Sequence, residues 1–136
     1  MKKFIAFLVV VIIGIQFIPV ERTNPPVTSD IDAPTEVKTI LKKACYDCHS
    51  NETNWAWYTK VAPSSFLAVK DVNEGRKHLN FSEWGNYTDK TEKVKEEIWD
   101  EIREEQMPPW QYKIIHSDAK LTQEEKNLLR NWATNK

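Results

Sequence analysis

Two cysteines and a histidine stand together in the segment Cys45-Tyr46-Asp47-Cys48-His49, and the chain has no other cysteine. On one turn of a helix, residues i, i+3 and i+4 share a face, so both thiols and the imidazole can meet one edge of a flat ligand. Thiols can add to the vinyl groups of haem as thioethers, while the imidazole binds the iron. This C-x-x-C-H spacing predicts one covalent haem c, attached through Cys45 and Cys48, with His49 as the proximal iron ligand.

Three other chemistries use closely spaced cysteines: a thioredoxin-like redox pair, a zinc half-site and a small local disulfide. A thioredoxin-like site requires a βαβ context, and a zinc site requires further Cys or His at ligand spacing. The sequence offers neither feature, so it favours haem. A thiol-based redox protein that never binds haem stays as a separate hypothesis.

The second axial position of the iron has three candidate ligands besides the initiator methionine: Met107, His78 and His116. Met107 is the best placed, because Pro108 and Pro109 follow it, fix φ and keep the segment stiff. The two histidines lie in polar stretches, where a histidine is more often a surface residue. We therefore predict Met107 as the distal iron ligand. The alternative role for Met107 is to fill a gap in the core.

The bulk composition narrows the function. The chain has 136 residues, a single-domain length, with 40% hydrophobic and 29% charged residues. A net charge of -1 argues against nucleic-acid binding. The sequence shows no Ser-His-Asp set, no paired carboxylates and no phosphate loop, so we predict no hydrolase or transferase activity and no catalytic residue. The chain also has enough aromatic side chains to line a haem pocket, namely Trp55, Trp57, Tyr58, Trp84, Trp99, Trp110 and Trp132.

The N-terminus carries an uncharged, mostly apolar run over residues 4–20, directly after Lys2 and Lys3. Its length lies between a signal-peptide core of about 7 to 15 apolar residues and a full membrane span of about 20. Residues 1–20 are therefore predicted as a membrane anchor or signal sequence, and the uncleaved anchor is favoured because no small-x-small cleavage site follows closely. The positive-inside rule then sends the rest of the chain across the membrane.

Residues 21–33 contain two prolines and no periodic apolar pattern, which predicts an extended linker before a folded domain over 34–136. The first helix of that domain has an apolar face that runs straight into the cysteines. This face consists of Val37, Ile40, Leu41 and Ala44.

Three more helices are predicted, from Ser64 to about Asn73, from Thr91 to Gln106, and from a capping box at Thr122 and Glu125 onward. The predicted buried positions of the last two helices are Val94, Ile98, Ile102, Leu128, Leu129 and Trp132. No strand alternation of useful length appears. The sequence therefore predicts an all-α domain, preceded by an N-terminal membrane segment.

The folded part resembles the small bacterial haem-binding domain family of cytochrome c type. The matching segments are residues 44–51 (ACYDCHSN), 75–84 (GRKHLNFSEW), 107–110 (MPPW) and 121–122 (LT). The resemblance implies a cytochrome-c-like helical fold around one haem, with redox partner proteins of cytochrome c or di-haem peroxidase type. It implies haem attachment after export, hence a place on the periplasmic side of the cytoplasmic membrane. It also implies that a proline carbonyl, here that of Pro63, accepts the Nδ1 proton of His49.

Two haem functions are consistent with these residues. The first is a membrane-tethered mono-haem electron carrier with iron held by His49 and Met107. The second is a haem-based sensor or peroxidase-associated module whose distal site is open. The identity of the second axial ligand separates the two.

Overall fold

The computed structural model describes residues 1–134, and this part of the chain is helical. The α-helices are α1 (Lys2–Ile15), α2 (Thr35–Ala44), α3 (Tyr46–His49), α4 (Ser64–His78), α5 (Thr91–Arg103), α6 (Trp110–Ile115) and α7 (Gln123–Thr134). Three 3₁₀ helices connect them: η1 (Trp57–Lys60), η2 (Trp84–Lys90) and η3 (Ser117–Ala119). The described residues form no β-strand, only an isolated bridge between Ser29 and Glu83. The predicted helical class is confirmed.

The predicted N-terminal membrane segment is wrong. Helix α1 (Lys2–Ile15) has 14 residues, so it is about 21 Å long, whereas a bilayer core is about 30 Å thick. Among residues 1–134, no helix combines the length and the apolar character that a membrane span needs. The helix ends where the side chain of Gln16 turns to the backbone of Ala62, donating to its carbonyl at 3.1 Å and accepting from its N–H at 3.0 Å.

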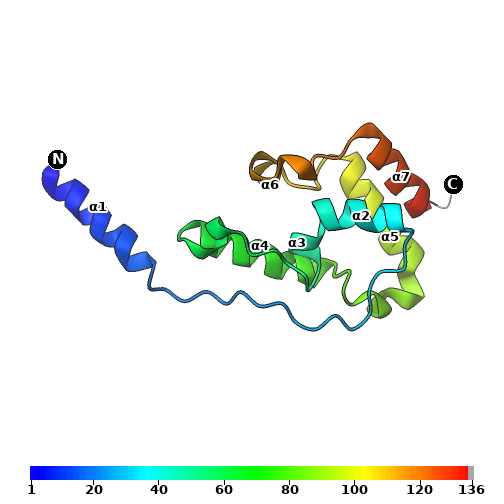
Figure 1. Cartoon of the computed structure of the whole chain (residues 1–136), viewed down its shortest axis with the longest axis horizontal. Coiled ribbons are helices and arrows are strands. Elements are labelled where there is room, and N and C mark those ends of the chain that lie inside the picture. Colours follow the sequence, from blue (N-terminus) through cyan, green and yellow to red (C-terminus); the bar gives the residue numbers. More distant parts are fainter. Residues whose placement is uncertain (135–136) are drawn as a thin grey trace.

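The helices form two groups that meet at the C-x-x-C-H motif. Helix α7 packs against α2 and α5 in one group, and α4 packs against α3 and η1 in the other. Figure 1 shows α2 beside α7, with α3 leading from α2 toward α4. Because α2 runs into α3 at Cys45, the motif lies at the junction of the two groups.

The apolar patterns place the core correctly at most positions. All four predicted residues of α2 are buried, as are Val94, Ile98 and Ile102 of α5. The capping box is present, since Thr122 and Glu125 exchange backbone-to-side-chain hydrogen bonds of 2.9 and 3.2 Å. Leu129 is buried, but the predicted burial of Leu128 is wrong, because this residue is 42% exposed.

Two predicted helix ends differ from the structure. Helix α4 continues to His78 rather than ending near Asn73, passing through Gly75. Helix α5 ends at Arg103 rather than Gln106, because Glu105 adopts a positive φ of 59° that breaks the helix.

The segment predicted as a linker is in contact with the domain. Figure 1 shows residues 16–33 running as an extended chain from α1 to α2. The N–H groups of Thr28 and Ser29 both donate to the carbonyl of Ser82, at 3.0 and 3.1 Å. Ile31 is completely buried in the core. We call residues 22–31 the N-terminal strap.

Candidate functional site

The C-x-x-C-H residues lie on a single helical turn. Cys45 ends α2, its N–H donating to Leu41 at 2.8 Å, and its own carbonyl accepts from the N–H groups of Cys48 and His49 at 3.2 and 2.9 Å. The structure therefore brings Cys45, Cys48 and His49 together in the local geometry that the spacing predicts.

The ring of His49 is held in one tautomer. Its Nδ1 lies 3.1 Å from the carbonyl oxygen of Gly75 and 3.1 Å from that of Leu79. Carbonyls only accept, so Nδ1 must carry the proton. Burial lowers the pKa of His49, so at neutral pH the ring is uncharged and its Nε2 lone pair is free. A histidine that binds a metal through Nε2 is commonly fixed in this way.

The carbonyl partner differs from the one that the resemblance implied. The expected acceptor for Nδ1 of His49 was the carbonyl of Pro63, but that oxygen accepts the N–H of Phe66 at 3.1 Å. Pro63 lies at the start of α4, whereas the acceptors Gly75 and Leu79 lie at its end. Because α4 extends to His78, its C-terminal end places the carbonyls of Gly75 and Leu79 next to Nδ1 of His49.

Helix α4 approaches the motif at backbone distance. A Cβ atom placed on Gly75 would lie 2.4 Å from the carbonyl oxygen of Cys48 and 3.0 Å from its carbon. Only glycine allows this approach. Gly75 thus allows α4 to lie close enough to the motif for the carbonyl of Gly75 to reach Nδ1 of His49.

The two thiols are not activated. Burial, with the charge of the other cysteine, raises the pKa of Cys45 to about 12. Burial, with the charges of Asp47 and Asp71, raises the pKa of Cys48 to about 11. Reactive redox cysteines have lowered pKa values, so this environment disfavours a thiol-based redox pair.

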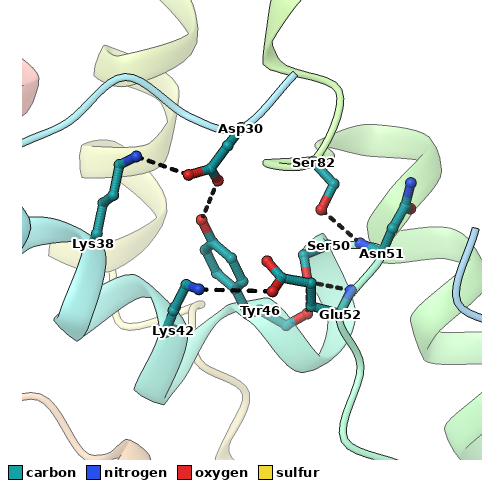
Figure 2. Close-up of polar contacts among 8 residues, drawn as sticks. All are labelled: Asp30, Lys38, Lys42, Tyr46, Ser50, Asn51, Glu52 and Ser82. Carbon is teal, nitrogen blue, oxygen red and sulfur yellow. Dashed lines mark hydrogen bonds and ion pairs between the residues drawn. The ribbon is translucent and has the colours of Figure 1, made fainter. Parts of the chain in front are cut away.

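Tyr46 fixes the motif to the core and to the N-terminal strap. The ring is buried and stacks on Phe81 at a centroid distance of 5.3 Å. Its hydroxyl donates to Asp30 at 3.1 Å, and Lys38 contacts the same carboxylate at 2.7 Å (Figure 2). Burial opposes the charge of Asp30, but the hydrogen bonds from Lys38 and Tyr46 outweigh it and lower the pKa of Asp30.

The chain that follows His49 is held by buried polar contacts. The N–H of Asn51 donates to Oγ of Ser82 at 2.9 Å (Figure 2), and the side chain of Asn80 donates to that of Asn51 at 2.9 Å. The carbonyl of His49 accepts from the N–H of Phe81 at 2.8 Å. These contacts bind the end of the motif to the loop after α4.

Arg76 joins the motif to the N-terminal strap. Its guanidinium donates to the carbonyl of Ser50 at 2.7 Å and to Oγ1 of Thr53 at 2.8 Å. It also donates to the carbonyl of Thr23 and the side chain of Asn24, each at 2.9 Å. The sequence showed Arg76 only as part of a resembling segment and gave no sign of this role.

Asp47 accepts hydrogen bonds from two directions. One carboxylate oxygen accepts the N–H of Asn54 at 2.8 Å, and the other accepts the hydroxyl of Tyr112 at 2.7 Å. Tyr112 belongs to α6, which no sequence pattern predicted. The contact therefore links the motif to a helix that begins just after Met107.

The three candidate distal ligands lie in different surroundings. Met107 is 36% exposed and follows α5, with its N–H on the carbonyl of Glu101 at 3.1 Å. His116 Nε2 forms a 2.7 Å hydrogen bond with the hydroxyl of Tyr58. His78 is exposed at the end of α4. Met107 as distal ligand stays a prediction.

A cavity of about 420 Å³ adjoins Met107. Its apolar lining includes Ile102, Trp110 and Leu121, and Lys120 is among its polar residues. Neither cysteine of the motif is part of the lining, nor is His49.

The donor set fits haem, because two neutral thiols and an imidazole with a free Nε2 share one turn. Within residues 1–134, no group of three or more Cys, His, Asp or Glu could hold a metal ion alone.

Comparison with known proteins adds one finding. The family model described as a haem-binding domain matches residues 10–135 of the chain. No curated protein and no solved structure gives a significant match.

Proposed function

The chain belongs to the haem-binding domain family, and we propose that it holds one haem c covalently through Cys45 and Cys48, with His49 as the proximal iron ligand, for electron transfer. Bound haem supplies a one-electron iron couple. The protein's part is to fix the thiols and the imidazole on one turn and to keep Nε2 of His49 available.

The observation that carries this proposal is the double carbonyl contact of His49. Carbonyls of Gly75 and Leu79 hold the Nδ1–H in place. This orients Nε2, and such contacts also raise the basicity of a ligating histidine. A thioredoxin-like pair would need a lowered thiol pKa, whereas burial raises it at both cysteines.

Covalent attachment is tested by replacing both thiols. The full chain is expressed with haem-attachment machinery, beside a Cys45→Ala/Cys48→Ala variant. We expect wild-type protein to gain the mass of one haem and retain it after denaturation, because thioethers survive unfolding. The double variant should lose all covalent haem. Two titratable free thiols in the wild-type protein would contradict the proposal.

The proposal includes Met107 as the distal ligand, and Met107→Ala tests it. We expect loss of the iron-methionine charge-transfer band and a fall in reduction potential on the order of 0.1 V, within the range of about 0.8 V that axial ligands control. The measurements are absorption spectra and redox titration. Gln106→Ala is the neighbouring control. An unchanged spectrum for Met107→Ala would exclude this ligand, and His78→Ala would be the next variant.

A second candidate function is a haem-based sensor or peroxidase-associated module with an open distal site. It is favoured by the exposure of Met107, which is 36%. Rapid carbon monoxide binding by the reduced wild-type protein would support it. No spectral change with carbon monoxide would support the electron carrier.

We also propose, from the resemblance alone, that haem is attached after export and that redox partner proteins exchange electrons with this domain on the periplasmic side. Fractionation of cells that express the full chain tests this location. Covalent haem in the cytoplasmic fraction would contradict it.

A further inference from the structure

Helix α6 (Trp110–Ile115) is weakly supported by backbone packing. Within the described part of the chain, η3 (Ser117–Ala119) is the only helix whose backbone lies against it. Its side chains Trp110, Ile114 and Ile115 are more than 60% exposed. The position of α6 therefore depends on a few side-chain contacts.

Two of these contacts reach the half of the molecule that carries the C-x-x-C-H motif. Tyr112 donates to Asp47, inside the motif, at 2.7 Å. His116, directly after α6, is hydrogen-bonded to Tyr58 of η1 at 2.7 Å. Because η1 packs on α4 and α4 packs on α3, both contacts end on the same group of helices.

The two contacts support each other. The rings of Tyr112 and His116 are stacked, with centroids 4.2 Å apart and planes 12° from parallel. Burial, followed by the hydrogen bond and charge of Asp47, raises the pKa of Tyr112, so its hydroxyl stays protonated as a donor. Asp47 is itself fixed by the N–H of Asn54 at 2.8 Å.

Met107 lies between this tethered helix and α5. On one side, its N–H and that of Gln106 bond to the carbonyl of Glu101. On the other side, Pro108 and Pro109 lead directly into α6. Prolines limit backbone rotation, so a displacement of α6 is passed on to Met107.

We propose that Tyr112 is a positioning residue that, through Asp47, holds the Met107 segment in place relative to the haem attachment turn, with the contact between His116 and Tyr58 as a second tether. This inference rests on the proposed function, in which Met107 binds the iron. Asp47, which stands between the two cysteines of the C-x-x-C-H motif, thereby serves to position Met107 rather than to attach the haem.

The test compares three variants of the haem-loaded full chain, each of which loses one hydroxyl. Tyr112→Phe removes the hydroxyl that reaches Asp47 and keeps the ring. Tyr58→Phe removes the second tether from a different element. Thr88→Val is the matched control, since it removes a hydroxyl that donates to the carbonyl of Gly85 at 2.7 Å within η2.

We expect Tyr112→Phe to accelerate carbon monoxide binding to the reduced protein by about three- to ten-fold, the factor expected when one hydrogen bond is lost from a two-state equilibrium. The iron-methionine band should weaken in parallel. Thr88→Val should match the wild type. If Tyr112→Phe does not fold, Tyr58→Phe decides by the same two measurements.

Wild-type carbon monoxide kinetics and band intensity in Tyr112→Phe would overturn the inference. An equal change in Thr88→Val would also overturn it, because any lost hydroxyl would then loosen the site. Met107→Ala separates this failure from that of the proposed function. If Met107→Ala removes the band and Tyr112→Phe does not, only the positioning role fails, whereas an unaffected Met107→Ala spectrum overturns the ligand assignment itself.

Discussion

A Gly75→Ala variant is expected to be less stable than the wild type by about 1 to 3 kcal/mol, the usual cost of forcing extra atoms into a packed contact. Within a helix, Gly→Ala normally stabilises by roughly 0.5 to 1 kcal/mol. Here the new Cβ would meet the carbonyl oxygen of Cys48 at 2.4 Å, and that oxygen belongs to backbone rather than to a flexible side chain. The steric term therefore outweighs the helix propensity.

The same variant should impair haem loading. To relieve the clash, α4 must move away from α3, and the carbonyl of Gly75 then leaves Nδ1 of His49. We expect a lower ratio of haem to protein, measured by absorbance after expression with attachment machinery, along with a lower denaturant midpoint. The matched control is Gly14→Ala, also within a helix, where a Cβ has no neighbour within 4 Å. A Gly75→Ala protein as stable as wild type would contradict this account.

The parts of the fold that local patterns encode could be predicted from the sequence. The apolar face of α2, which includes Val37 and Leu41, could be predicted as buried because a helix repeats every 3.6 residues. The capping box at Thr122 and Glu125 reports a helix start through a contact between residues three apart. In both cases, the residues that decide the structure are neighbours in the sequence.

The sequence predictions fell short where contacts between residues distant in the sequence determine the structure. Local rules favour a helix end at Gly75, yet α4 continues to His78, and the close contact with the backbone of Cys48 explains why a glycine stands inside the helix. Residues 21–33 contain prolines and polar side chains, but Ile31 is buried against a core assembled from the rest of the chain. The apolar N-terminal run, in turn, has a suitable composition but forms a helix that ends at Ile15.

The candidate site likewise combines a local feature that could be predicted with distant contacts that could not. The spacing of Cys45, Cys48 and His49 is local, so their common turn could be predicted. The contacts that orient them come from positions far along the chain: Arg76 from α4 and Tyr112 from α6. Arginine and tyrosine on exposed or unpredicted helices carry no sequence signal for such a role, because their partners are set by tertiary packing.

Phe81→Ala is expected to cost about 3 to 5 kcal/mol of folding free energy, the range for removing a buried aromatic ring. Phe81 is 1% exposed, stacks on the ring of Tyr46 at a centroid distance of 5.3 Å and makes an edge contact with the ring of His49 at a centroid distance of 6.3 Å. A small domain has a total stability of about 5 to 15 kcal/mol, so the loss should be visible as a large shift in the denaturant midpoint.

The Phe81→Ala substitution should also change the haem site, because Phe81 contacts His49 directly. Its N–H holds the carbonyl of His49, and its ring packs beside the imidazole. Phe81→Leu keeps an apolar side chain and should recover part of the stability. Phe17→Ala, at a position 81% exposed, should stay within about 0.5 kcal/mol of wild type. If Phe81→Ala lost stability but kept the wild-type haem spectrum, the hydrogen bonds of His49 to Gly75 and Leu79 would be sufficient to orient the ring. A changed spectrum would show that packing from Phe81 is also required.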